Sequence, residues 1–145
     1  MKIMVINGPN LNMVGIREKN VYGTKSYEDL IQMIESYCEE NQIEVICRQS
    51  NHEGDLIDWL QEAYFEKYDG VVINPGGYTH TSVALGDAVK AIAPLPVVEV
   101  HISDISDRED FRKFSYLAPY CMKQIKGKGL EGYLEAIGLL TRTDK

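Results

Sequence analysis

Short apolar segments alternate with longer segments of helical periodicity along this chain. Four apolar segments rich in β-branched residues lie at 3–6, 43–47, 71–73 and 97–100. Most of them are continuous rather than alternating, which is typical of strands covered on both faces, as in parallel sheets. We therefore predict four buried strands at these positions and a short fifth strand around 122–126.

The segments between these strands carry apolar residues at the three-to-four spacing of a helix with one buried face. We predict four helices: one capped by Ser26, one from about Gly54 to Lys67, one that begins at Thr79 or Thr81, and one over about 130–140. The third must end before Pro94, because proline lacks the backbone N–H and clashes with the preceding turn. Alternating strands and helices form right-handed βαβ units, so the predicted fold class is α/β, a doubly wound parallel sheet with helices on both faces.

Length and charge restrict the classes of partner. The 145 residues correspond to one domain, 1–145, without an internal repeat or linker. Fifteen basic and 22 acidic side chains give a formal charge of −7, which repels phosphate backbones and anionic lipids. No apolar segment approaches the roughly 20 residues that span a bilayer, and no signal-type cleavage region follows Met1. We therefore expect a cytoplasmic protein that binds neither nucleic acid nor membranes.

Polar residues follow each of the four main strands, at 7–12, 49–53, 74–82 and 101–103. The carboxyl ends of parallel strands lie along one edge of a sheet, and ligands bind in the crevice outside them. Since His52, His80 and His101 all lie in these segments, we expect the three histidines to converge on one rim and to form a site. The alternative is that these residues only shape turns and cap helices.

The segment Gly8–Lys25 is much longer than the about 2–6 residues of an ordinary βα loop. We interpret it as a functional lid that carries Arg17, Glu18 and Tyr22. The alternative is a solvated surface loop whose arginine and tyrosine have no function.

Other chemical motifs lack the context that they need. Residues 127–132 match G-x-G-x-x-G, but they are not in the first βα turn and no ribose-binding acid follows about 20 residues later. P-loop, G-x-S-x-G and H-E-x-x-H motifs are absent, and the three cysteines have no C-x-x-C spacing. A metal held by His52, Glu53, His80 and His101 is disfavoured because their spacing matches no ligand signature.

Four motifs together closely resemble those of type II 3-dehydroquinate dehydratases. They lie at 7–12 with 15–18 and 22–23, at 49–54, at 74–82, and at 99–103. They occur in the family's order and span nearly the whole chain. The resemblance implies a flavodoxin-like fold, a homododecamer built as a tetramer of trimers, no metal or cofactor, and conversion of 3-dehydroquinate to 3-dehydroshikimate and water in the shikimate pathway.

The resemblance also implies roles for individual residues. Tyr22 is the base, Arg17 activates it, and His101 is the general acid. The implied contacts to substrate or enolate are Asn12, Asn74, His80, the backbone of Ile102 and Ser103, Arg112 and, from a neighbouring subunit, Asp87. The chain departs from the usual pattern at Gly86, Asp104, Ser106 and Asp107. These departures put the subunit contacts near Asp87 in question and make the approach to Arg112 more acidic.

The elimination of water that the resemblance implies, from a β-hydroxy ketone, requires an acid, a base and a group that stabilises an enolate. A tyrosine with an ordinary pKa of about 10 is a poor base at neutral pH, so Tyr22 needs a cation such as Arg17. Glu99 and His101 are two apart in a predicted strand and so point to the same side, where the carboxylate can orient the imidazole. The alternative is a structural Glu–His pair.

Further groups of the predicted site serve binding. Asn12 and an ordered water can donate to the enolate oxygen. Arg112 offers a planar set of donors, and the helix N-terminus after Ser82 is expected to face the rim and to favour an anion. No lysine ends a strand-like segment, so we expect no Schiff base and no covalent intermediate.

Two other functions remain open from the residues alone. The first is a flavodoxin-like module that binds a flavin or phosphate at the same rim, although the first turn lacks a Ser/Thr-rich phosphate loop. The second is a hydrolase that uses Ser103 or Ser82 with His101, although neither serine lies on a strained nucleophile elbow.

Overall fold

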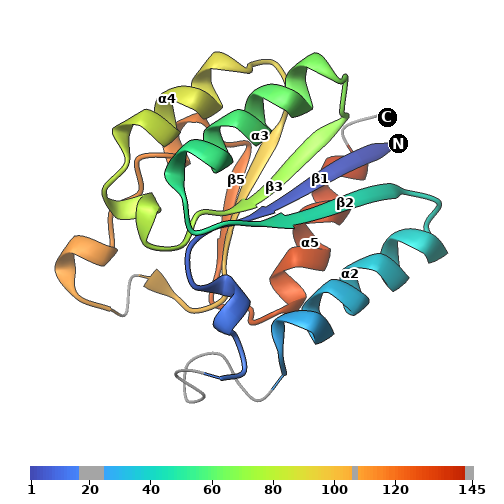
Figure 1. Ribbon diagram of the computed structural model, residues 1–145, viewed down its shortest axis with the longest axis horizontal. Helices are drawn as coiled ribbons and strands as arrows, with labels where there is room; N and C mark the ends of the chain where they lie inside the picture. The colour runs from blue at the N-terminus through green and yellow to red at the C-terminus, as the bar shows by residue number, and fades with distance from the viewer. Residues whose placement is uncertain (17–24, 106–107, 143–145) are drawn as a thin grey trace.

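A five-stranded sheet in which every strand is parallel to its neighbours forms the centre of the protein (Figure 1). The computed structural model describes residues 1–16, 25–105 and 108–142. The strands are β1 (Lys2–Asn7), β2 (Glu44–Gln49), β3 (Gly70–Asn74), β4 (Val97–His101) and β5 (Lys123–Lys126). Their spatial order is β2-β1-β3-β4-β5, which is the order of flavodoxin-like sheets. The predicted fold class is therefore confirmed.

Helices cover both faces of this sheet. They are α2 (Tyr27–Glu40), α3 (Glu53–Phe65), α4 (Val83–Ala91) and α5 (Glu131–Arg142). Figure 1 shows α3 and α4 on one face and α2 and α5 on the other. Each face has its own apolar core, so both sides of the central strands are buried. This double burial explains why the strands are continuous apolar segments rather than alternating ones.

Serine side chains cap the starts of α2 and α4. Ser26 caps α2 as predicted: its Oγ accepts from the Asp29 N–H at 3.1 Å, and the Asp29 carboxylate accepts from the Ser26 N–H at 2.9 Å. The predicted start of the third helix was wrong, because α4 begins at Val83 and its cap is Ser82. Thr79 does not cap a helix because its hydroxyl is turned toward Glu99, to which it donates a hydrogen bond of 2.6 Å.

Short 3₁₀ helices shape the edge where the strands end. After β1 comes η1 (Leu11–Met13), and after β3 comes η2 (Gly76–His80). Gly76 has φ of +60°, and a Cβ there would lie 3.0 Å from the carbonyl oxygen of Pro9. Only glycine allows this close approach without strain, so the turns after β1 and β3 pack directly on each other. No helix among the described residues is long and apolar enough to cross a membrane.

Candidate active site

A cleft of about 190 Å³ opens at the carboxyl edge of the sheet, beside the ends of β3 and β4. Six of the residues that the sequence predicted for the site line it: Asn74, His80, His101, Ile102, Ser103 and Arg112. They come from β3, η2, β4, the segment after β4, and η4 (Asp110–Arg112). The parallel sheet therefore brings together side chains from separate parts of the chain, as expected for this edge.

Other predicted residues lie outside the lining of the cleft. Asn12 is exposed in η1, next to the cleft-lining Leu11, and Asp87 is exposed on α4. His52 follows β2 at the same edge of the sheet, at the N-cap of α3, but it is exposed and does not line the cleft, so two of the three predicted histidines, His80 and His101, meet in it. Arg17 and Tyr22 lie outside the described residues.

Glu99 and His101 form the buried side of the site. The pleat of β4 turns both side chains to the same side of the sheet, where His101 Nε2 is hydrogen-bonded to Glu99 Oε2. Glu99 is fully buried, and only 6% of His101 is exposed. Because an ionised carboxylate only accepts hydrogen bonds, Nε2 carries the proton in this pair and Nδ1 is the other ring nitrogen available for proton transfer.

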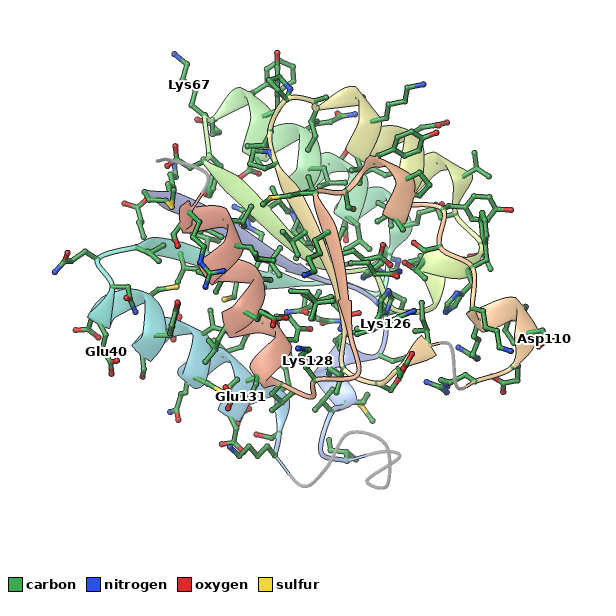
Figure 2. All side chains as sticks on the ribbon, turned by 180° about the vertical axis from the view of Figure 1, so that it is seen from behind. Glu40, Lys67, Asp110, Lys126, Lys128 and Glu131 are labelled. Atoms are coloured by element: carbon green, nitrogen blue, oxygen red, sulfur yellow. The ribbon has the colours of Figure 1, made fainter. Side chains whose placement is uncertain are left out.

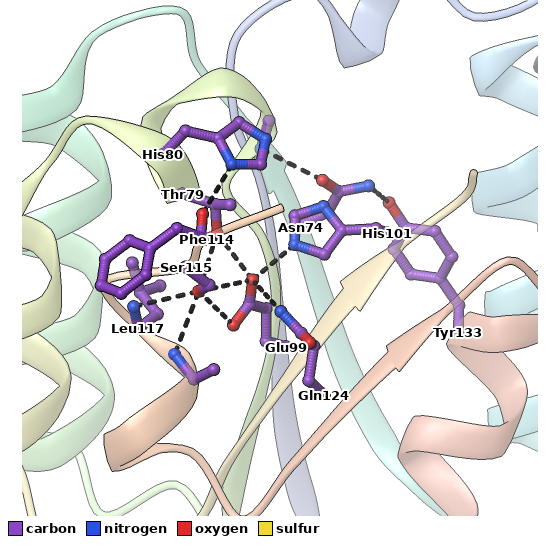
Figure 3. Close-up of polar contacts among 12 residues, drawn as sticks. Asn74, Thr79, His80, Glu99, His101, Phe114, Ser115, Leu117, Gln124 and Tyr133 are labelled. Carbon is purple, nitrogen blue, oxygen red and sulfur yellow. Dashed lines mark hydrogen bonds and ion pairs between the residues drawn. The ribbon is translucent and has the colours of Figure 1, made fainter. Parts of the chain in front are cut away.

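Three further donors hold the Glu99 carboxylate (Figure 3). They are the Thr79 hydroxyl at 2.6 Å, the Ser115 hydroxyl at 2.9 Å and the Gln124 amide at 3.2 Å. Burial alone raises the pKa of Glu99, but the hydrogen bond and charge of His101, with the donors Thr79 and Gln124, outweigh burial and hold this pKa below its ordinary value. Glu99 is therefore an anion fixed beneath the imidazole.

The Ser115 hydroxyl donates its proton to Glu99, because its other two partners are N–H groups that only donate. Its Oγ accepts the backbone N–H groups of Leu117 at 3.1 Å and Ala118 at 3.0 Å. The sequence analysis did not identify Thr79, Ser115 or Gln124 as partners of Glu99, because three separate elements bring them to it. The carboxylate environment is thus a product of the tertiary fold.

His80 also lines the cleft, next to His101. Its Nδ1 donates to the carbonyl oxygen of Phe114 at 2.7 Å, and its ring lies 6.3 Å from the His101 ring, nearly parallel to it. Burial lowers the pKa of His80, and electrostatic interaction with His101 and Arg112 lowers it further, which outweighs the hydrogen bond to Phe114 and the charge of Glu99 that raise it. Because a carbonyl oxygen only accepts, Nδ1 of His80 carries the proton in its hydrogen bond to Phe114.

Two arginines make the cleft cationic although the chain as a whole is acidic. Arg112 and Arg108 both line it, and the sequence analysis named Arg112 as a site residue but not Arg108. Arg108 could have been predicted from its position, four residues before Arg112 in the same segment. Arg112 is 32% exposed, and its Nε lies 2.8 Å from Glu109. Figure 2 shows Asp110, from the same segment, projecting from the outer edge of the molecule.

The N-terminus of α4 follows β3 at the carboxyl edge of the sheet, but its first residues do not line the cleft. The Ser82 hydroxyl donates to Glu53 and accepts from the Leu85 N–H at 2.8 Å. The carboxylate near this helix end is therefore Glu53 of the same chain. Ser82 is also absent from the lining of the cleft, so a nucleophilic pair of Ser82 with His101 has no geometric basis.

The structure describes the surroundings of two of the four positions that depart from the family pattern, Gly86 and Asp104. A Cβ on Gly86 would lie 2.5 Å from the Tyr116 carbonyl oxygen, so any larger residue requires the segment around Tyr116 to move. Asp104 lies against Gly127, whereas Ser106 and Asp107 fall outside the described residues.

The fold and the site place a histidine–carboxylate pair and two arginines at the ligand edge of an α/β sheet, an arrangement suited to acid–base chemistry on a small anion. Among the described residues, no three His, Cys, Asp or Glu side chains gather as a metal site does.

Comparisons with known proteins identify the family. The sequence matches the family described as "Dehydroquinase class II" over residues 1–141. A 3-dehydroquinate dehydratase of Fusobacterium nucleatum subsp. nucleatum is 58% identical over 139 residues, covering 94% of each chain. One of Clostridium beijerinckii is 56% identical over 140 residues, covering 97% of this chain and 95% of the other. This chain belongs to the class II dehydroquinase family.

A solved structure agrees with this assignment. The crystal structure of the type II dehydroquinase from Butyrivibrio crossotus superposes with a TM-score of 0.96 at 56% identity, covering 97% of both chains. The resemblance read from the four sequence motifs is therefore confirmed. The comparisons give no support to a flavin-binding or phosphate-binding module.

Proposed function

We propose that this protein is a lyase that converts 3-dehydroquinate to 3-dehydroshikimate and water, a step of the shikimate pathway toward chorismate and the aromatic amino acids. Relatives with 50% to 58% identity over most of both chains are named 3-dehydroquinate dehydratase, which supports this reaction. The single observation that carries the proposal is the buried Glu99–His101 pair at the base of a cleft lined by two arginines.

The first proposed step removes a proton from C2 of the substrate. The Tyr22 phenolate, stabilised by Arg17, accepts this proton, and the electrons of the C–H bond move to the C3 carbonyl oxygen to form an enolate. Asn12, one residue beyond the cleft-lining Leu11, is the proposed donor to the enolate oxygen. The roles of Tyr22 and Arg17 are supported by the resemblance of the segment at 15–23 to the family.

The second proposed step expels the C1 hydroxyl as water. His101 donates a proton to this hydroxyl while the enolate returns to a ketone, so that a C1–C2 double bond forms and the C1–O bond breaks. Glu99 does not contact the substrate in this scheme. It acts through His101, by fixing the ring and stabilising the imidazolium form, which its buried and multiply hydrogen-bonded position supports.

The proposed binding contacts follow from the lining of the cleft. Arg112 binds the substrate carboxylate as a planar group of donors, and the backbone of Ile102 and Ser103 contributes further donors. Asn74 and His80 bind substrate oxygen atoms. These assignments need neither a cofactor nor a covalent intermediate.

The proposed assembly is a homododecamer, a tetramer of trimers, in the cytoplasm. In this arrangement Asp87 reaches the site of a neighbouring subunit, and its exposed position on α4 makes it accessible to another copy. Light scattering of the purified protein tests the subunit number. A monomer that is fully active would contradict the role of Asp87.

The reaction is tested by following the ultraviolet absorbance of the conjugated enone after 3-dehydroquinate is added. We expect turnover by the wild type, and a decrease of kcat by about 10² to 10⁴ in Tyr22→Phe and in His101→Ala, since each removes one proton-transfer group. Tyr37→Phe, which removes the hydroxyl of a half-buried residue of α2 that does not line the cleft, is the matched control. Absence of turnover by the wild type contradicts the function, and full turnover by both variants contradicts the assigned roles.

A further inference from the structure

Three polar side chains form a buried chain behind the cleft. Asn7 ends β1, Asn74 ends β3 as its direct neighbour in the sheet, and Tyr133 comes from α5. The Tyr133 hydroxyl donates to Asn7 Oδ1 at 2.6 Å and accepts from Asn74 Nδ2 at 2.9 Å. Tyr133 and Asn7 are fully buried, and Asn74 is 3% exposed where it lines the cleft.

These bonds fix the orientation of the Asn74 amide. A hydroxyl has one proton, and Tyr133 gives it to a carbonyl-type oxygen of Asn7 that is only able to accept. The Tyr133 oxygen therefore faces Asn74 as an acceptor, which requires the amide nitrogen on that side. On the other side, Asn74 Oδ1 accepts the N–H of Gly76 at 3.1 Å. Rotation of the amide by 180° would place its oxygen against the Tyr133 oxygen and its NH₂ group against the Gly76 N–H, so both hydrogen bonds would be lost.

From this geometry we infer that Tyr133 is a positioning residue for substrate binding, which acts by holding the Asn74 amide in one orientation. The inference rests on the proposed function, in which Asn74 binds substrate oxygen atoms. With partners on both its nitrogen and its oxygen, the Asn74 amide keeps one fixed orientation toward the cleft. Figure 3 shows Asn74 between Tyr133 and the residues of the cleft.

Packing alone does not require this hydroxyl. Tyr133 is among the largest fully buried side chains, and phenylalanine would fill the same space in the core formed by α2 and α5. Burial of a hydroxyl costs free energy unless the hydroxyl is hydrogen-bonded, so filling the core does not by itself explain why this residue is tyrosine rather than phenylalanine. The hydroxyl holds the Asn74 amide in one orientation. If this amide rotated freely, only a fraction of the molecules would have the orientation that binds substrate, and the apparent affinity would fall.

Tyr133→Phe tests this inference. We expect KM for 3-dehydroquinate to rise about tenfold while kcat stays within about threefold of the wild type, since a loss of about 1.4 kcal/mol in binding corresponds to a factor of ten. Tyr37→Phe is the matched control, because Tyr37 packs against Gly138 of α5 in the same core. We expect its KM to match that of the wild type.

A double-variant comparison separates positioning from a general effect on structure. If Tyr133 acts through Asn74, adding Tyr133→Phe to Asn74→Ala raises KM no further than Asn74→Ala alone. An unchanged KM in Tyr133→Phe, a KM rise that adds fully to that of Asn74→Ala, or a decrease in kcat alone would each overturn the inference. Should Tyr133→Phe not fold, Asn7→Ala takes its place, because it releases the Tyr133 proton to donate to Asn74 instead. The same rise in KM is then expected.

The dissociation constant of 3-dehydroquinate, measured by calorimetry on the same variants, distinguishes this inference from the proposed function. Binding without turnover in the wild type contradicts the dehydratase reaction, while a tenfold weaker binding in Tyr133→Phe still supports the role of Tyr133. Normal turnover in the wild type with equal binding in both proteins contradicts only the role of Tyr133.

Discussion

The two sides of the cleft are built in opposite ways. The Glu99–His101 side is part of a central strand, is almost fully buried, and has donors from three other elements. The Arg112 side lies on the short helix η4 near the surface, and its guanidinium pairs with Glu109, which is 58% exposed. A proton-transfer group benefits from a fixed, water-poor setting, whereas an anion-binding group must release its partner to receive substrate. We therefore expect the buried side to determine kcat and the exposed side to determine KM.

Glu99→Gln gives the largest expected effect of these variants. The amide keeps the shape of the carboxylate but removes the charge that stabilises an imidazolium at His101, so we predict that kcat falls by about 10² with little change in KM. Steady-state kinetics by enone absorbance measure this. Glu62→Gln, which removes a carboxylate paired with Arg48 far from the cleft, is the control and should retain wild-type kcat. Equal kcat in Glu99→Gln and wild type contradicts the role of the buried side.

Arg112→Lys tests the exposed side. Lysine keeps the charge but loses the planar set of donors, so we predict an increase in KM of about tenfold and a kcat within about twofold of the wild type. Lys113→Ala is the matched control, since Lys113 neighbours Arg112 but pairs with the fully exposed Asp110. A decrease in kcat without a change in KM would show that the division between the two sides is wrong.

Ser115→Ala tests whether the donors around Glu99 matter individually. Glu99 keeps Thr79 and Gln124 in this variant, so we expect kcat to fall only about threefold. Thermal unfolding should show a lower Tm than the wild type, because the N–H groups of Leu117 and Ala118 lose their acceptor. A kcat as low as that of Glu99→Gln would mean that Ser115 alone keeps Glu99 in place.

The smallest expected effect is on stability at acidic pH. The pKa of Glu99 is lower in the folded than in the unfolded chain, so its stabilisation is complete above the unfolded value of about 4.3 and is lost as pH falls through the folded pKa. Urea unfolding at pH values from 6 down to 3 should therefore show a steeper loss of unfolding free energy in wild type than in Glu99→Gln. Parallel curves would contradict the lowered pKa.

Much of the fold was predictable because the strands carry a direct signal. Buried parallel strands are continuous apolar segments, and their carboxyl ends mark the ligand edge, so the strand positions and five lining residues of the cleft followed from the apolar pattern. The sixth, Arg112, was named from the family resemblance. The Glu99–His101 pairing was also predictable, because residues two apart in a strand share a side. These features depend on local spacing.

Features that depend on tertiary contacts were not predictable in this way. Tyr133 lies 126 positions from Asn7, and the hydrogen bond between them exists only because α5 packs against β3 and β4. The start of α4 was misplaced since Thr79 is an ordinary cap residue in sequence, and only the fold turns its hydroxyl toward Glu99. The hydrogen bond of Ser82 to Glu53 was also not predicted, because the two residues are 29 positions apart.

The central claim is that proton removal at C2 and loss of the C1 hydroxyl are carried out by separate groups, with His101 serving only the second. His101→Ala mixed with 3-dehydroquinate in D₂O and followed by proton NMR tests this most directly. The account predicts that a C2 proton of the substrate is replaced by deuterium while almost no 3-dehydroshikimate forms. Formation of 3-dehydroshikimate at the wild-type rate would contradict it.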